Sequence, residues 1–336
     1  MKLTWEALDL ELITPFRIAH GASVQRANVL VRLDEGLGEA AAVPQYLETQ
    51  VGIIAYLEDL VDLIAGQADP DQIDAILDRL PPGSQAARTA IDMALHDAWG
   101  KRLGVPLFRL LGLNPDHLPE TSYTIAIDTP EVMAERAAQS KWPVLKIKLG
   151  GDDDLSAVAA IRERTSSRLR LDANCGWTRQ SAAWLIPRLA DYAIEFVEQP
   201  LAADDLEGFR WLRSQRLGVP IFADESVRVS KDVPSLAGAA DGVVVKLMKS
   251  GGIREAVKVI HTARAMDMQV MMSCMVESSL AVTAAAHLAP LCDYADLDGP
   301  LLVKNDPFRG LRYSGAQMQL PELPGLGVIP KPFDPG

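Results

Sequence analysis

Short apolar runs recur from about residue 120 onward, and each one ends in a polar residue and is followed by a segment with helical spacing. The polar end residues lie 22 to 27 positions apart, about one strand plus one helix, and they are Thr124, Lys148, Asp172, Glu198, Asp224, Lys246, Ser273 and Asp298. Because right-handed βαβ crossovers make every strand parallel, eight such units can close on themselves. The pattern predicts an α/β fold, a TIM-like (β/α)7β barrel over residues 119–310.

The first 118 residues follow a different pattern. Alternating apolar and polar positions in LTWEALDLEL, ANVLVRLDEG and GEAAAV predict strands, and helical spacing follows near residues 56–64, 71–80 and 85–103. This order predicts an α+β capping domain over residues 1–118. The Pro- and Gly-rich segment 311–336 contains no further barrel unit, and we expect it to pack back on the capping domain.

Composition and charge limit the classes of partner. Hydrophobic residues make up 48% of the 336 residues and charged residues 23%, which is enough apolar material for two folded domains. The net charge is -12 and the basic residues are scattered, so neither nucleic acid nor membrane is expected as a partner. No long apolar run or signal-peptide core occurs, which predicts a cytoplasmic protein.

Three acids end consecutive predicted strands. Asp172, Glu198 and Asp224 belong to strands three, four and five of the barrel, so their carboxylates should gather at one rim. Three clustered carboxylates repel one another unless a cation lies between them. The three cysteines and five histidines lack the spacing of a zinc site, which leaves oxygen ligation and favours Mg²⁺.

Two lysines end strands on opposite sides of the predicted barrel. Lys148 lies on strand two and Lys246 on strand six, so their amines should approach a central substrate from opposite faces. Lys146 lies two positions before Lys148 and faces the same interior. We expect the nearby positive charges to lower the pKa of Lys148 and of Lys246, which suits them as bases. One base on each face predicts inversion of a carbon beside a carboxylate by proton transfer.

At these residues the chain resembles the enolase superfamily, its muconate-lactonizing subgroup, and most closely the dipeptide epimerases. The resemblance rests on KIK, LDAN, VEQP, ADES and VVVKLMKSGG and covers nearly the whole chain. It implies an isomerase with Lys148 and Lys246 as acid/base residues and Lys146 near the substrate carboxylate. It also implies Asp172, Glu198 and Asp224 as Mg²⁺ ligands, and it places Asn174, Gln199 and Glu225 behind them.

The motif DLDGP on the eighth strand narrows the choice among the reactions of this subgroup. In dipeptide epimerases a DxD here binds the substrate's α-ammonium group, which the resemblance assigns to Asp296 and Asp298; His20 and Met275 are the other expected substrate contacts. Members acting on Ala-Glu carry basic residues in the loop after the first strand, where this chain reads TPFRIAHGASVQRAN. Either Arg17, His20 or Arg26 supplies that charge, or the site takes less acidic dipeptides.

Three other readings remain open at this point. N-succinylamino acid racemases and o-succinylbenzoate synthases use the same lysines and metal, although the DxD disfavours their anionic substrates. A Schiff-base aldolase needs one nucleophilic lysine and leaves the three acids unexplained. A binding protein on the same scaffold would lack turnover. Members of the superfamily are often oligomers, so a homo-oligomer is compatible with this chain.

Overall fold

The computed structural model describes residues 1–19, 21–67 and 69–332. Eight parallel strands form one sheet in chain order, and a bridge from Thr121 to Ala295 brings the first strand to the last. The strands are β4 (Tyr123–Ile125), β5 (Val144–Lys148), β6 (Arg168–Asp172), β7 (Ile194–Glu198), β8 (Ile221–Ala223), β9 (Gly242–Lys246), β10 (Gln269–Ser273) and β11 (Tyr294–Asp296). Every predicted apolar run contains one of these strands, which confirms the TIM-like barrel.

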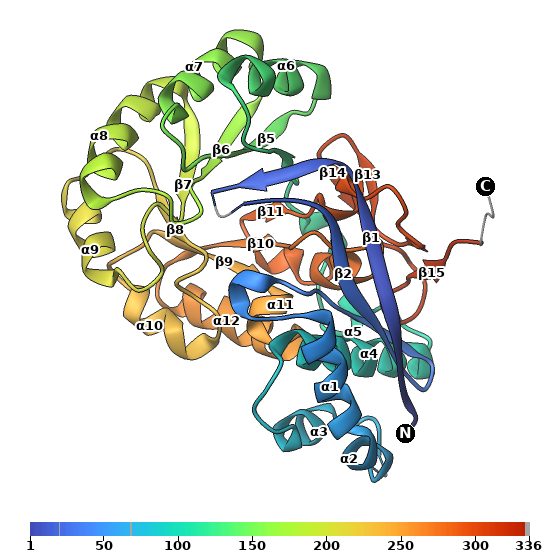
Figure 1. Cartoon of the computed structure of the whole chain (residues 1–336). Coiled ribbons are helices and arrows are strands. Elements are labelled where there is room, and N and C mark those ends of the chain that lie inside the picture. Colours follow the sequence, from blue (N-terminus) through green and yellow to red (C-terminus); the bar gives the residue numbers. More distant parts are fainter. Residues whose placement is uncertain (20, 68, 333–336) are drawn as a thin grey trace.

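Helices connect the strands and surround the barrel (Figure 1). They are α6 (Pro130–Ser140), α7 (Asp154–Arg164), α8 (Arg179–Leu189), α9 (Leu206–Ser214), α10 (Val233–Leu236), α11 (Leu247–Ser250), α12 (Ile253–Ala265) and α13 (Ser279–Ala286). Several begin at a hydroxyl side chain: Thr178 and Ser181 form a reciprocal capping box at α8, and Ser278 caps α13. Such caps satisfy N–H groups that have no partner inside the helix.

The N-terminal part combines a three-stranded antiparallel sheet with helices. Its elements are β1 (Leu3–Ile18), β2 (Gly21–Leu33), β3 (Gly36–Ala40), α1 (Gln50–Asp59), α2 (Val61–Ala65), α3 (Ile73–Arg79), α4 (Gln85–Leu103) and α5 (Leu107–Leu110). Helix α4 lies directly against β3, because Gly38 has no side chain; a Cβ there would lie 1.9 Å from the Ala90 carbonyl oxygen. The predicted strands are present, as are the helices expected near 71–80 and 85–103, whereas the helix expected near 56–64 is divided at Leu60 into α1 and α2.

The segment TPFRIAHGASVQRAN does not form the loop that the sequence suggested. Strands β1 and β2 continue through it, with Phe16 opposite Ser23 and Ile18 opposite Gly21 after a bulge between Glu11 and Phe16. Figure 1 shows this long hairpin (dark blue) reaching from the capping helices across to the mouth of the barrel. The loop was expected from the family resemblance, whereas in this chain Pro15 and the bulge are accommodated within β1.

The C-terminal segment lies between the two parts. The short strands in and beside it form two antiparallel pairs, and 3-10 helices connect other elements of the chain. Leu107 N–H donates to the Gly325 carbonyl at 2.8 Å, and Leu326 N–H donates to Asp97 at 2.8 Å. The remaining elements are β12 (Phe308–Arg309), β13 (Arg312–Ser314), β14 (Gln317–Gln319), β15 (Ile329–Pro330), η1 (Pro44–Tyr46), η2 (Pro115–His117), η3 (Ala190–Tyr192), η4 (Ser230–Asp232), η5 (Ala289–Leu291) and η6 (Gly299–Leu302).

His287, directly after α13, links this C-terminal segment to Phe108. Its ring is fully buried between the Phe108 N–H at 3.2 Å and the Leu326 carbonyl at 3.1 Å. Burial lowers the pKa of His287 to about 4, whereas an unfolded histidine has a pKa of about 6.5. The unfolded chain therefore binds the proton more readily between these values, and stability falls as pH falls through that window.

We expect the free energy of unfolding to decrease by about 2 kcal/mol between pH 7 and pH 5 because of this one group. Urea unfolding of the wild type and of His287→Gln at both pH values measures the difference, which should be smaller in the variant. His261→Gln, at an exposed histidine, is the matched control. Equal pH dependence in the wild type and His287→Gln would contradict the assignment.

Among residues 1–19, 21–67 and 69–332, no helix has both the length and the apolar character needed to span a membrane.

Candidate active site

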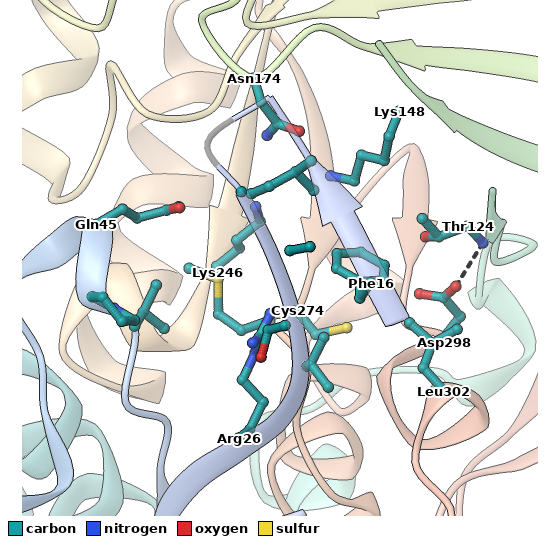
Figure 2. Close-up of a pocket in the computed structure, with 18 of the residues that line it drawn as sticks. Phe16, Arg26, Gln45, Thr124, Lys148, Asn174, Lys246, Cys274, Asp298 and Leu302 are labelled. Atoms are coloured by element: carbon teal, nitrogen blue, oxygen red, sulfur yellow. Dashed lines mark hydrogen bonds between the residues drawn. The ribbon is translucent and has the colours of Figure 1, made fainter. Parts of the chain in front are cut away.

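A cavity of about 440 Å³ opens at the C-terminal ends of the barrel strands. The hairpin tip and the segment that follows β3 complete its wall (Figure 2). The lining residues are Phe16, Ile18, Gly21, Ala22, Ser23, Arg26, Ala42, Val43, Pro44, Gln45, Thr124, Lys146, Lys148, Asn174, Lys246, Cys274, Met275, Val276, Asp296, Asp298 and Leu302. The cavity therefore combines apolar walls with a small set of charged groups, as ligand sites commonly do.

Lys148 and Lys246 enter this cavity from opposite walls (Figure 2). Lys148 ends β5 and Lys246 ends β9, four strands apart in the eight-stranded order. Both side chains are buried, with 8% and 6% of the residue surface exposed. Each amine contacts one acid: Lys148 Nζ lies 2.6 Å from Asp172 Oδ2, and Lys246 Nζ lies 2.6 Å from Asp224 Oδ2. The structure thus gives one cavity two amines on facing walls.

The three strand-end acids are completely buried beside the lysines. Lys146 Nζ lies 2.8 Å from Glu198 Oε2 and 3.2 Å from Asp172 Oδ2, so two of the acids converge on one ammonium group. Asp224 contacts Lys246 instead. Positive side chains therefore occupy the space between the carboxylates in this arrangement.

The pKa of Lys246 was expected to be lowered by a metal ion close to it, and the protein's own groups shift this pKa in the opposite direction. Burial alone would lower it, but the charge of Asp224 outweighs burial and raises the pKa of Lys246 well above its usual value. The pKa of Lys146 is raised in the same way. Burial would lower it, but the charges of Asp296 and Glu198 raise it. The sequence argument counted neighbouring cations, whereas in the folded chain the carboxylates lie closer to each amine.

The pKa values of the neighbouring acids Asp172 and Glu198 shift in opposite directions. Burial would raise the pKa of Asp172, but Lys148 and Lys146 lower it below its usual value. Burial and repulsion by Asp172 raise the pKa of Glu198 well above the ordinary range. Glu198 is therefore the acid that most lacks positive charge, which is the electrostatic situation that a bound cation relieves.

The acids fit a divalent cation by their chemistry, although they do not form a ready-made cage. Across the described residues, no group of three acid, histidine or cysteine side chains is spaced to hold an ion as it stands. All three acids nevertheless offer only oxygen, lie fully buried and stand at the C-terminal ends of three adjacent strands, Asp172 and Glu198 as the last residue and Asp224 as the next one. Carboxylates of this kind suit Mg²⁺, which keeps places for water or substrate oxygens. The residues present therefore fit the predicted ion, provided that Mg²⁺ replaces the lysine ammonium groups as the partner of these carboxylates.

Asn174, Gln199 and Glu225 lie directly behind the acids. Asn174 N–H donates to Asp172 Oδ1 at 3.0 Å, and its side chain donates to Glu225 at 3.2 Å. Gln199 Oε1 accepts the Asp224 N–H at 2.8 Å. Burial, followed by repulsion from Asp224, raises the pKa of Glu225 to about 7. The Gln199 side chain thus fixes the main chain at Asp224, and the main chain at Asn174 holds the Asp172 carboxylate.

The two acids of DLDGP both reach the cavity but have different partners. Asp296 accepts hydrogen bonds from Ser122 Oγ at 2.7 Å, Ser273 Oγ at 3.0 Å and Lys146 Nζ at 2.8 Å. Asp298 Oδ2 accepts the main-chain N–H of Thr124 at 2.7 Å (Figure 2). Asp296 is therefore bound to other side chains, whereas Asp298 faces the cavity with few partners.

The hairpin residues that were expected to contact the substrate differ in whether they reach the cavity. Arg26 reaches into the cavity from β2 (Figure 2), whereas Arg17 is exposed and does not line the cavity. Met275 lines the cavity on the opposite, barrel side. His20 lies outside the described residues. No acidic side chain among the described residues forms an ion pair with Arg26, so this cation is available to a ligand.

Lys249 is a contact that the sequence did not identify. It lies in α11, three residues after Lys246, and is 3% exposed. Its Nζ contacts the Asp224 carboxylate, the Asp224 carbonyl at 2.6 Å and the Val244 carbonyl at 3.0 Å. The spacing of two lysines three residues apart was visible, but only the turn of α11 directs the second amine back under Asp224.

Comparisons with known proteins agree with this architecture. Residues 129–333 match the family described as enolase C-terminal domain-like, and residues 5–112 match the mandelate racemase / muconate lactonizing enzyme N-terminal domain. An L-Ala-D/L-Glu epimerase of Bacteroides thetaiotaomicron is 38% identical, with 98% of this chain and 88% of the relative covered.

Two solved structures also resemble the chain closely. A dipeptide epimerase of Cytophaga hutchinsonii, complexed with Mg and D-Ala-L-Val, is 30% identical with a TM-score of 0.93 and covers 99% of this chain and 97% of its own. An N-succinyl Arg/Lys racemase of Bacillus cereus is 31% identical with a TM-score of 0.92 and covers 98% of this chain and 96% of its own. With both domain models matched and the barrel, cap and charged cavity in place, the chain belongs to the enolase superfamily, among the mandelate racemase and muconate lactonizing enzymes.

Proposed function

We propose that this protein is a Mg²⁺-dependent dipeptide epimerase, which inverts the α-carbon of the C-terminal residue of a dipeptide. The observation that carries the proposal is the position of Lys148 and Lys246 on facing walls of one cavity. The epimerase names of the relatives support the dipeptide as substrate class. The fit of Asp172, Glu198 and Asp224 to a hard cation supports the metal.

The lysines carry the proton transfer. Bound by Asp172, Glu198 and Asp224, Mg²⁺ supplies Lewis-acid stabilisation of the negative charge that develops on the substrate carboxylate. Nζ of one lysine removes the α-proton from one face, and Nζ of the other returns a proton to the opposite face. Lys146, between the acids and the cavity, adds a fixed positive charge beside the substrate carboxylate. The apolar walls of the hairpin exclude water from these groups.

An N-succinylamino acid racemase is the second candidate, because a neighbour with that name is 31% identical. It would use the same lysines and acids. Its substrate, however, carries a second carboxylate in place of the ammonium group of a dipeptide. Asp298 faces the cavity with a single main-chain hydrogen bond, and this acid repels an anionic substituent and attracts a cationic one. The acids of the eighth strand thus favour the dipeptide.

One experiment separates these candidates. A library of L,L-dipeptides and N-succinyl amino acids is incubated with the protein and Mg²⁺ in heavy water, and exchange at the α-carbon is read as a mass shift. We expect exchange in dipeptides and much slower exchange in their N-succinyl counterparts. Exchange in the N-succinyl compounds alone would overturn the proposal.

Arg26 favours an acidic side chain in the substrate. Its guanidinium lines the cavity, and burial lowers the pKa of Arg26, so a carboxylate would replace the solvent that this cation has lost. We expect Arg26→Met to lower kcat/KM for L-Ala-L-Glu about tenfold relative to L-Ala-L-Leu. Steady-state kinetics with both dipeptides measures this selectivity. Arg17→Met, on the exposed side of the same hairpin, is the control; equal selectivity in Arg26→Met and the wild type would contradict the role.

A further inference from the structure

Lys249 is a buried lysine that the proposed proton transfer does not use. Its Nζ donates to Asp224 Oδ1, to the Asp224 carbonyl at 2.6 Å and to the Val244 carbonyl at 3.0 Å. An ammonium group has three N–H donors, so these acceptors use all of them. Lys249 is 3% exposed and is not among the residues that line the cavity. It is therefore a fixed charge inside the barrel wall and not an acid or base of the reaction.

The two carboxylate oxygens of Asp224 face different surroundings. Oδ1 accepts from Lys249, behind the cavity wall, whereas Oδ2 lies 2.6 Å from Nζ of Lys246, which lines the cavity (Figure 2). The main chain of Asp224 is also held on both sides, because its carbonyl accepts from Lys249 and its N–H donates to Gln199 Oε1 at 2.8 Å. Only Oδ2 can therefore exchange its partner without breaking contacts inside the wall.

Asp172 shows the same division with a different donor. Its Oδ1 accepts the main-chain N–H of Asn174 at 3.0 Å, and its Oδ2 lies 2.6 Å from Nζ of Lys148, which lines the cavity. Both aspartates thus hold one oxygen in the wall and offer the other to the cavity. The donor to Asp172 is a main-chain group, which side-chain substitutions other than proline leave in place. The donor to Asp224 is a side chain, so Lys249 is the residue through which this arrangement can be changed.

A carboxylate that is held at one oxygen offers a cation only its other oxygen. Ca²⁺ takes roughly six to eight oxygens and often binds a carboxylate through both, whereas Mg²⁺ needs a near-octahedral set and keeps waters among its ligands. We propose that Lys249 is a positioning residue that withholds Oδ1 of Asp224 from the cation and thereby makes the site prefer Mg²⁺ over Ca²⁺. This inference rests on the metal role of the acids in the proposed function, and it adds the residue that sets the choice of ion.

Binding of Mg²⁺ and of Ca²⁺ to the full chain, measured by isothermal titration, tests this role. We expect the wild type to bind Mg²⁺ at least about tenfold more tightly than Ca²⁺. Lys249→Met removes the ammonium group and keeps an unbranched side chain, so Oδ1 becomes free to join Oδ2 on the larger ion. We expect the ratio of the Ca²⁺ Kd to the Mg²⁺ Kd to fall about tenfold in this variant, mainly through tighter Ca²⁺ binding.

Lys258→Met, at an exposed lysine of α12, is the matched control and should keep the wild-type ratio. A lysine that only stabilised the fold would change the binding of both ions by the same factor, because lost packing does not distinguish between them. An unchanged ratio in folded Lys249→Met therefore overturns the inference. A wild type that binds Ca²⁺ as tightly as Mg²⁺ also overturns it, and that measurement decides the matter even if Lys249→Met folds poorly.

The exchange assay in heavy water separates this inference from the proposed function. A wild type that prefers Mg²⁺ but exchanges the α-proton of no dipeptide overturns the epimerase proposal and leaves the role of Lys249 standing. Exchange in dipeptides together with an unchanged ion ratio in Lys249→Met has the opposite meaning, because the function then stands and the role of Lys249 falls.

Discussion

Lys148→Ala should stop inversion while leaving α-proton exchange in one of the two epimers. With Lys148 removed, Lys246 still faces one side of the cavity, so it can remove a proton from that face and return a deuteron to the same face. Inversion needs both amines and should fall by about 10²- to 10⁴-fold, the usual contribution of general acid–base catalysis. Lys246→Ala should show the complementary pattern, with exchange confined to the other epimer.

The measurement follows deuterium incorporation and epimer content separately. Purified L-Ala-L-Glu and L-Ala-D-Glu are incubated with each variant in heavy water, mass spectrometry reports exchange, and chiral chromatography reports inversion. Lys231→Ala, at an exposed lysine, should behave like the wild type. Exchange of the same epimer by both variants would show that the amines act from one side, and the two-base mechanism would then be wrong.

The sequence was sufficient to predict the barrel because each of its strands carries two independent signals. An apolar run such as VVVK is buried along its whole length in the structure, and the polar residue that ends it lies at the rim. The spacing of 22 to 27 residues then restricts the connection to a single helix. Lys148, Lys246 and the three acids were predicted to be neighbours by this topology alone, and the structure places them together.

What the sequence could not predict depends on contacts between distant segments. The family resemblance implied a loop after the first strand, and only the pairing of Phe16 with Ser23 and of Ile18 with Gly21 shows that both strands continue through this segment. Asp296 and Asp298 are equivalent by spacing. They differ in the fold because β11 ends between them and because Ser122 and Ser273 come from neighbouring strands.

The direction of the Lys246 pKa shift also depends on a contact between segments that are distant in the sequence. The sequence predicts a metal ion close to this lysine, and repulsion between the two charges would lower the pKa of Lys246. In the folded chain Asp224 Oδ2 lies 2.6 Å from Lys246 Nζ, and this contact raises the pKa instead. The sign of an electrostatic effect follows the nearest opposite charge, and that distance is a property of the fold.

Glu198→Gln should weaken Mg²⁺ binding and remove most of the activity. Glu198 is fully buried, and burial and the charge of Asp172 raise its pKa. The free energy gained when a divalent cation binds this acid should therefore exceed that for an exposed acid. Removing its charge should weaken Mg²⁺ binding by at least about tenfold, and turnover by about 10³-fold at fixed Mg²⁺. Isothermal titration measures the first quantity, steady-state kinetics the second, and Glu207→Gln at an exposed acid is the control.

Chelation should remove activity without unfolding the chain. The three acids have cationic side chains as close neighbours, namely Lys146, Lys148, Lys246 and Lys249, so we expect the carboxylates to keep cationic partners when Mg²⁺ is removed. We expect EDTA to abolish α-proton exchange, added Mg²⁺ to restore it, and the melting temperature to change by only a few degrees. Exchange that persists at full rate in excess EDTA would contradict a metal role, and unfolding on chelation would show that the lysines do not replace the ion.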